Sequence, residues 1–221
     1  MFWTRKRKAK PQDRKRWLYD AVAAVCEREG FVRIPALNQF RRENASGFEC
    51  IIVSLGVLPA STLFELHVGL RNESVEELAF QYTNGSPMFR RDSMTLVASA
   101  AKLQGLEHQR FEITELPDVE AAMTTMQPFL ADVAFPWLCA HRTVEAISRA
   151  LNEQPLEKTR LMPNQVHRCF RGLAAARVAE NTDYDALEQA YDGFVRSLHA
   201  PEHQLALFEE LKQHLRAVVW N

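Results

Sequence analysis

GFECIIVSLGVLPASTLFELHVGL, residues 47–70, is the stretch that decides the fold class. Two runs rich in β-branched and aromatic residues, 47–55 and 62–70, flank the turn-forming segment 59–61 (Pro-Ala-Ser). In the later run, the even positions from 64 to 70 hold Phe, Leu, Val and Leu, and this period of two predicts a strand with one face on a core. The earlier run is apolar on both faces, so we expect it at the centre of the sheet.

The residues before this stretch predict a helix and further extended segments. From 13 to 29 the apolar residues recur at spacings of three and four, which is helical periodicity, and Gly30 stands where that helix would end. Residues 31–34 and 37–42 follow, separated by Pro35. We expect these segments and the two runs to form an antiparallel meander.

The residues after the stretch predict one short helix and a closing strand. Ser74-Val75-Glu76-Glu77 fits a capping box, in which the serine hydroxyl and the glutamate carboxylate satisfy backbone donors, so we expect a helix over 75–82. Residues 110–115 predict a strand that closes the sheet. The pattern of residues 94–103 fits a helix as well as a strand.

Beyond Pro117 the whole pattern is helical. Five segments carry apolar residues at helical spacing: 118–134, 143–151, 164–180, 183–198 and 201–219. The sequence therefore predicts an α+β fold, with a mostly antiparallel four- or five-stranded sheet packed by helices and a C-terminal helical extension. We expect a basic arm over 1–12, the α+β domain over 13–152 and the helical extension over 153–221.

The charges are distributed unevenly along the chain. Residues 1–16 hold eight Lys or Arg and one Asp, net +7, in a chain of formal net charge −1, so residues 17–221 carry net −8. Clustered cations bind phosphates through counterion release, and Phe2 and Trp3 add the aromatics that a membrane surface would use. The acidic remainder would be repelled by either polyanion. We expect a solvated or partner-touching arm, keep nucleic-acid binding through residues 1–16 as an alternative, and do not expect a membrane partner.

The sequence contains no recognisable catalytic, metal or cofactor signature. The eight glycines form neither GxGxxG nor GxxxxGK, and no serine stands in GxSxG. His199 and His203 have a zinc-like spacing, but Pro201 between them predicts a turn instead of one helix face. We therefore predict no catalytic residue, no metal and no cofactor.

The cysteines and the apolar runs bear on the compartment. No CxxC pair occurs, and the four cysteines stand among apolar neighbours, so we expect four buried thiols: Cys26, Cys50, Cys139 and Cys169. The basic run is not followed by the apolar stretch of a signal peptide, and no run of eighteen apolar residues occurs. These observations predict a cytoplasmic, reducing setting.

Phe-Arg-Arg occurs twice, at 40–42 and at 89–91. An aromatic ring beside arginines suits stacking and the binding of phosphate or carboxylate. We nevertheless expect each phenylalanine to enter the core while the arginines stay in water next to Glu43 and Asp92. The candidate binding residues come from the arm and from these two repeats: Arg5, Lys6, Arg7, Lys8, Arg41, Arg42, Arg90 and Arg91.

Several segments resemble an uncharacterised family of bacterial α+β proteins of unknown function. The shared features are a helix that ends in Gly30-Phe31, an Arg-bearing strand with Phe40-Arg41, the strand Ile51-Ile52-Val53-Ser54-Leu55-Gly56-Val57, and Phe135-Pro136-Trp137-Leu138 before a short helix. The likeness covers about residues 15–152. Some similar small proteins are immunity-type inhibitors that bind a toxin, and this is what the resemblance implies about function.

We therefore expect a non-enzymatic bacterial protein that binds another protein, with an immunity-type toxin inhibitor as the most concrete version. The acidic charge of residues 17–221 favours a basic partner. Two alternatives stay open, a nucleic-acid-associated protein that uses the basic arm and an enzyme whose residues assemble only in the fold.

Overall fold

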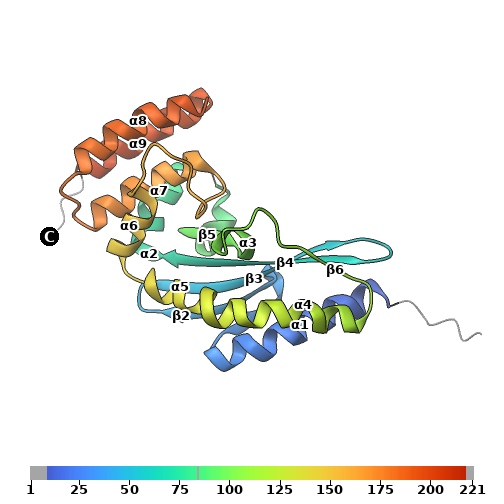
Figure 1. Cartoon of the computed structure of the whole chain (residues 1–221). Helices are drawn as coiled ribbons and strands as arrows, with labels where there is room; N and C mark the ends of the chain where they lie inside the picture. The colour runs from blue at the N-terminus through green and yellow to red at the C-terminus, as the bar shows by residue number, and fades with distance from the viewer. Residues whose placement is uncertain (1–8, 84, 218–221) are drawn as a thin grey trace, which may run out of the picture. The chain divides into compact units, whose positions relative to one another are not determined.

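The computed structural model describes residues 9–83 and 85–217, which form an α+β fold as predicted (Figure 1). These residues group into two compact units that interleave along the chain. The first unit contains the described residues up to Arg42 together with Cys50–Val68 and Ser99–Pro136. The second contains Glu43–Glu49, Gly69–Ala98 and the described residues from Trp137 onward.

One antiparallel sheet has the strand order β1-β2-β3-β4-β5, and β6 also pairs with β4. Its strands are β1 (Val32–Ile34), β2 (Gln39–Asn44), β3 (Gly47–Val57), β4 (Thr62–Asn72), β5 (Leu96–Ser99) and β6 (Phe111–Ile113). The central place of β3 confirms the prediction from its two apolar faces. On β4 the side chains of Phe64, Leu66, Val68 and Leu70 are buried, as the alternation predicts.

Helices α1 (Pro11–Cys26) and α4 (Leu116–Pro128) pack against each other in the first unit (Figure 1). Proline at the first position of α1 suits a helix start, and the short 3₁₀ helix η1 (Glu27–Glu29) extends α1 to Gly30. Gly30 has φ of 80° and closes the helix in the left-handed conformation, as the sequence predicts.

The helical region after α4 is more broken than its periodicity predicts. The single helix expected over 118–134 continues as a π-helix, η5 (Phe129–Ala134), and then as α5 (Phe135–Ala140). Pro128 lies at this junction, where the missing N–H disturbs the regular helical hydrogen bonds. Residues 94–103 resolve into both of the expected states, because β5 is followed by the four-residue helix α3 (Ala100–Leu103).

Arg14 corrects the expectation that the basic residues near the N-terminus are solvated. Its side chain is fully buried and donates hydrogen bonds to the carbonyls of Leu58, Ala60 and Ser61 and to the Thr62 hydroxyl. These acceptors form the turn between β3 and β4. One of the eight cations of residues 1–16 is therefore a structural residue of the hairpin.

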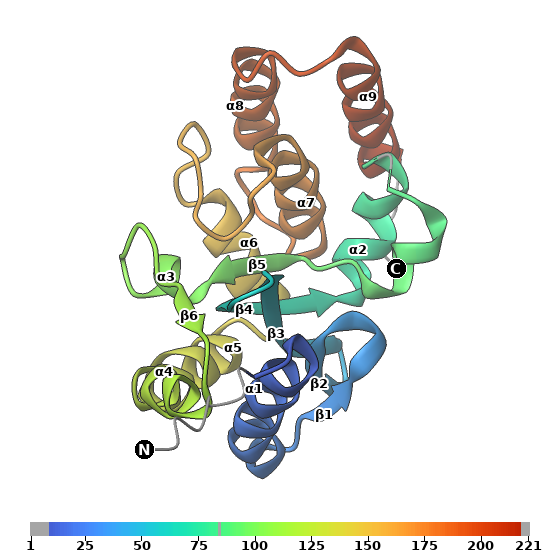
Figure 2. The same cartoon turned by 90° about the vertical axis from the view of Figure 1, so that its right-hand side faces the viewer.

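Helix α7 is the centre of the second unit. It contacts four other helices of that unit, and Figure 2 shows it between α2 and α6. These five helices are α2 (Glu73–Ala79), α6 (Val144–Asn152), α7 (Gln165–Val178), α8 (Tyr184–Ser197) and α9 (Glu202–Ala217). Gly172 on α7 allows close approach, because a Cβ there would lie 2.7 Å from the Tyr191 hydroxyl and 2.5 Å from Asn152 Oδ1.

Arg168, also on α7, holds the loop between α6 and α7. Its guanidinium is buried and donates five hydrogen bonds to main-chain carbonyls, at Leu151, Gln154, Pro155 and Glu157. The ring of Tyr191 lies 5.0 Å from the guanidinium carbon. Arg168 thus orders the first part of a loop without regular structure, and the Gln165 side chain holds its last part at Thr159 and Met162.

The start of α2 differs from the predicted capping box. The N-cap is Asn72, whose side chain accepts a hydrogen bond from the Val75 backbone N–H, so the helix begins one residue before Ser74. Asn72 is a good cap in its own right, and it ends the strand that precedes the helix. Glu76 is not a solvent-facing helix residue but is fully buried.

The 3₁₀ helix η3 (Phe80–Tyr82) follows α2.

The domain boundary expected between residues 152 and 153 stays a prediction. The two compact units are defined by packing, and each contains several separate segments of the chain.

Candidate functional site

Two neighbouring large apolar side chains of the second unit are exposed at the second Phe-Arg-Arg repeat. Met88 is 80% exposed and Phe89 is 57% exposed, and both lie in the 3₁₀ helix η4 (Pro87–Asp92). Arg90 and Arg91 follow them and are also exposed. We call residues 85–93 the η4 turn.

The two Phe-Arg-Arg repeats therefore behave differently. Phe40 is completely buried, as expected, but the expectation that Phe89 enters the core is wrong. The two settings differ, because Phe40 lies on a strand of the sheet whereas Phe89 lies on a short 3₁₀ helix outside the sheet. An exposed Met-Phe pair is not explained by packing.

The buried side chain of Arg71 donates hydrogen bonds to the backbone of the η4 turn. This arginine is the second-last residue of β4, its side chain is 2% exposed, and its Nη1 donates to the Arg90 carbonyl at 2.8 Å. The same nitrogen donates to the Ser93 carbonyl at 3.2 Å and to the Ser93 hydroxyl at 2.5 Å. Because these bonds hold both ends of the Arg-Arg segment, the side chains of the turn project from a rigid base.

Glu73 holds Arg71 in place with two hydrogen bonds. Arg71 Nε and Nη2 donate to the Glu73 carboxylate at 2.6 and 2.9 Å, which is the planar two-point geometry of strong arginine–carboxylate pairs. The hydrogen bond from Arg71 lowers the pKa of Glu73, and the charges of Arg90 and Arg91 add to this effect. Glu73 is therefore ionised and close to both exposed arginines.

Beneath this pair lies a fully buried carboxylate, Glu76. Arg171 on α7 donates to it from Nε at 2.6 Å and from Nη2 at 2.9 Å, and Arg71 Nη1 lies 3.9 Å from Glu76 Oε2. Burial would raise the pKa of Glu76, but the charge and hydrogen bonds of Arg171, aided by Ser93, hold it below its ordinary value. The turn, α2 and α7 are thus joined by one network of charges.

His167 borders this network from α7. Burial, followed by the charge of Arg171, lowers the pKa of His167, so its imidazole is neutral at pH 7. A neutral ring adds no further positive charge beside Arg171.

The first Arg-Arg pair has a different setting, in the first unit. Arg42 lies over the Phe31 ring, with the guanidinium carbon 4.4 Å from the ring centroid, and donates to the Glu29 carbonyl at 2.6 Å. Arg41 donates to the Gln39 side chain. These contacts assign Arg42 a packing role at the end of α1. The remaining candidates, Arg5, Lys6, Arg7 and Lys8, lie outside the described residues.

Sequence reasoning missed Arg71, Glu76 and Arg171. A signal for Arg171 exists, because residues 172–176 read Gly-Leu-Ala-Ala-Ala, and so many small residues in one helix indicate close packing on all sides. An arginine directly before such a run would be buried and would need a carboxylate. Arg71 directly follows an apolar strand, which places it too at the edge of the core.

The thiols and histidines give no catalytic or metal constellation in the described ranges. Cys26, Cys50 and Cys169 are buried as expected, but the expectation for Cys139 is wrong, because it is exposed on α5. Burial raises the pKa of Cys26 and of Cys169 to about 12, which makes them unreactive thiols. Within residues 9–83 and 85–217, no group of three His, Cys, Asp or Glu side chains could hold a metal ion.

Two hollows of the second unit lie along the α6 region. One of about 320 Å³ is lined by residues of α6 and of the α7 C-terminus, and one of about 460 Å³ by the loop that follows α6. In the first hollow, Asn152 is engaged by Ser148, by the Gly172 carbonyl and by the Tyr191 hydroxyl. Its side chain is therefore structural.

Comparison with protein-family models, with curated proteins and with solved structures finds no match for this chain. No helix among the described residues is long and apolar enough to cross a membrane.

Proposed function

We propose that this chain is a non-enzymatic protein that binds another protein through the η4 turn. The observation that carries the proposal is the exposure of Met88 and Phe89 beside Arg90 and Arg91, on a backbone that Arg71 holds rigid. Phe, Met and Arg are enriched in protein interfaces, and a rigid base lowers the entropy lost on binding. A turn that only connected η3 to β5 would not need two exposed large apolar side chains.

The family resemblance adds a concrete form to the proposal. In that form the chain is an immunity-type inhibitor that occupies a toxin in the bacterial cytoplasm. The cytoplasmic setting rests on the cysteine usage and is part of the proposal.

The test is affinity capture from the native host with three forms of the full chain. The wild type should recover a partner protein, and the double variant Met88→Ala/Phe89→Ala should weaken its binding at least about tenfold, as expected for two interface anchors. Leu156→Ala is the matched control, because Leu156 is an equally exposed apolar residue in the α6–α7 loop. The thermal midpoints of all three should agree.

Equal capture by the wild type and the double variant would contradict the proposal. Recovery of nucleic acid alone, lost on removal of Arg5, Lys6, Arg7 and Lys8, would favour the nucleic-acid alternative instead.

A further inference from the structure

We infer that the partner of the η4 turn presents an acidic amphipathic segment, with an apolar stripe bordered by carboxylates. This inference rests on the proposed function and names the chemistry that the turn recognises. It replaces the basic partner that the net charge of the chain favours.

The turn places an apolar pair, Met88 and Phe89, directly before the cationic pair Arg90 and Arg91. In a 3₁₀ helix, residues three apart lie above one another on the same face. Met88 and Arg91 of η4 therefore share a face, with Arg90 and Phe89 next to them. A partner that packs on Met88 meets the Arg91 guanidinium on the same face. By the same spacing Phe89 shares its face with Asp92, and Arg90 follows Phe89 directly in the chain.

The two exposed guanidiniums are available to a partner. In the part of the chain that the structure describes, the side chains of Arg90 and Arg91 form no ion pair, and the nearby Glu73 carboxylate is held by Arg71. The printed contacts of Arg90 use its main-chain carbonyl, which accepts from Arg71 and from the Ser93 hydroxyl. Free guanidiniums recognise carboxylates by two parallel hydrogen bonds, so the charge at the contact selects acidic groups.

The surroundings of the turn favour discrete carboxylates over a continuous polyanion. Glu73 is ionised, half exposed and close enough to Arg90 and Arg91 for their charges to act on it, and Glu77 on the same helix is exposed. A nucleic-acid backbone or an anionic lipid surface would meet these carboxylates as well as the arginines. An acidic protein segment can place its own carboxylates on the arginines and its apolar groups between them.

The net charge of the chain does not oppose this inference. Attraction between charges at a contact acts over a few ångströms, whereas distant charges are screened within about 8–10 Å at physiological salt. The Arg90-Arg91 pair therefore outweighs the acidic residues elsewhere once the partner reaches the turn.

The test uses two synthetic probes and fluorescence anisotropy with the full chain. One probe is a 16-residue amphipathic peptide with Leu and Trp on its apolar face and Glu on its polar face. The other has Lys at every Glu position. We expect the acidic peptide to bind, the Lys peptide to bind at least tenfold more weakly, and Arg90→Glu/Arg91→Glu to weaken the acidic peptide at least tenfold.

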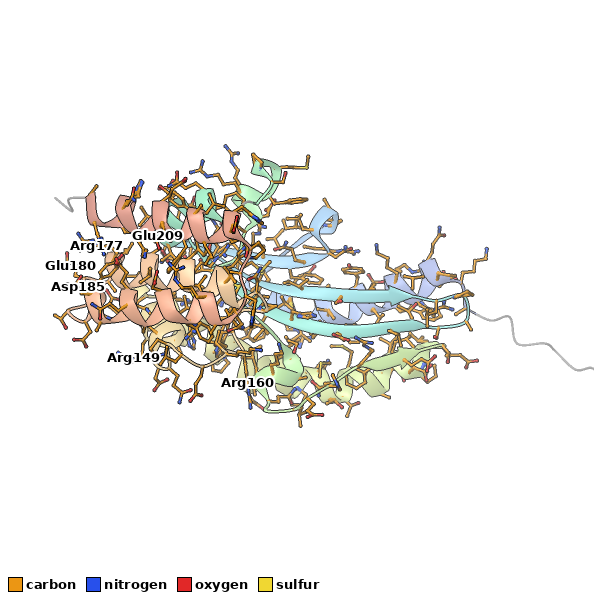
Figure 3. All side chains as sticks on the ribbon, turned by 90° about the horizontal axis from the view of Figure 1, so that it is seen from above. Arg149, Arg160, Arg177, Glu180, Asp185 and Glu209 are labelled. Atoms are coloured by element: carbon orange, nitrogen blue, oxygen red, sulfur yellow. The ribbon has the colours of Figure 1, made fainter. Side chains whose placement is uncertain are left out.

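The matched control is Arg149→Glu/Arg160→Glu, which changes the net charge by the same amount. Both arginines are exposed, on α6 and in the loop after it, and Figure 3 marks them. Figure 2 places α6 and α2 on opposite sides of α7, so this control alters a surface away from the η4 turn. It should bind the acidic peptide within about twofold of the wild type.

The outcomes separate this inference from the proposed function. Preference for the Lys peptide, no binding of either peptide, or equal loss in the control and in Arg90→Glu/Arg91→Glu would overturn the acidic partner. If a captured partner is still lost with Met88→Ala/Phe89→Ala, the η4 turn remains a binding site for a protein of other chemistry. If that double variant has no effect on capture, the proposed function itself fails.

Discussion

The substitution Glu76→Gln tests whether the charge network under the η4 turn is a buried, compensated set of ions. Glu76 is fully buried, and glutamine keeps its size and one acceptor while removing the charge. Arg171, whose side chain is 6% exposed, would then lose its carboxylate, and Arg71 would keep only Glu73.

The expected loss is large because a buried cation would be left without a counter-charge. Removing one partner of a buried ion pair costs about 3–5 kcal/mol. For a chain of this size each kcal/mol lowers the thermal midpoint by about 2–4 °C, so the midpoint should fall by about 6–20 °C. Urea denaturation followed by circular dichroism gives the free energy of unfolding directly.

A double variant distinguishes an ion pair from simple packing. Glu76→Leu/Arg171→Met removes both charges, and apolar replacements of a buried pair are often neutral, so it should be more stable than Glu76→Gln. A loss below about 1 kcal/mol for Glu76→Gln would refute the reasoning, because it would mean that water or other groups already neutralise Arg171.

The same carboxylate predicts a pH dependence with a definite sign. The folded-state pKa of Glu76 lies below its ordinary value of 4.5, so its stabilisation is fully present above pH 4.5 and is lost as the pH falls through the folded-state pKa. The difference in free energy of unfolding between the wild type and Glu76→Gln should therefore shrink on acidification below that pH. A difference that stays constant down to about pH 3 would show that Glu76 is not the titrating group.

Three further substitutions or reactions test other parts of the structure. Gly172→Ala should lower the free energy of unfolding by about 1–3 kcal/mol, because its Cβ would overlap the Tyr191 hydroxyl, and urea denaturation measures this. Arg14→Met should cost about 2 kcal/mol or more and raise hydrogen exchange at Leu58, Ala60 and Ser61, whose carbonyls would lose their donor. A thiol reagent should label Cys139 before the buried cysteines, and mass spectrometry of the folded protein identifies the labelled residue.

The elements with strong periodicity could be predicted from the sequence. The alternation of β4 and the two apolar faces of β3 are local patterns. They are enough to predict the sheet and the central position of β3 in it. The positions of Arg14, Arg71 and Arg171 could not be predicted, because a charged residue in sequence is expected in water unless its partner is known. Arg14 and Arg171 find their partners far along the chain, at Thr62, 48 residues away, and at Glu76, 95 residues away. The carboxylate that binds Arg71 is only two residues away, but the turn that Arg71 holds is 19 to 22 residues away.

The candidate site, like the fold, could be predicted from the sequence only in part. Arg90 and Arg91 could be named from the Phe-Arg-Arg repeat, but the exposure of Phe89 depends on its position in a 3₁₀ helix outside the sheet, which no local pattern encodes. Phe40 carries the same tripeptide and is buried. Tertiary surroundings, and not the motif, decide which repeat faces a partner.

The way Arg168 holds the α6–α7 loop affects which mutations that loop tolerates. Its hydrogen bonds go to main-chain carbonyls, so the path of the loop does not depend on which side chains occupy positions such as Glu153, Lys158 or Arg160. These exposed positions are free to accept new residues, and a new binding specificity could develop there without a loss of stability. This tolerance depends on one residue. Substitution of Arg168 would remove the hydrogen-bond donor of all of those carbonyls at once.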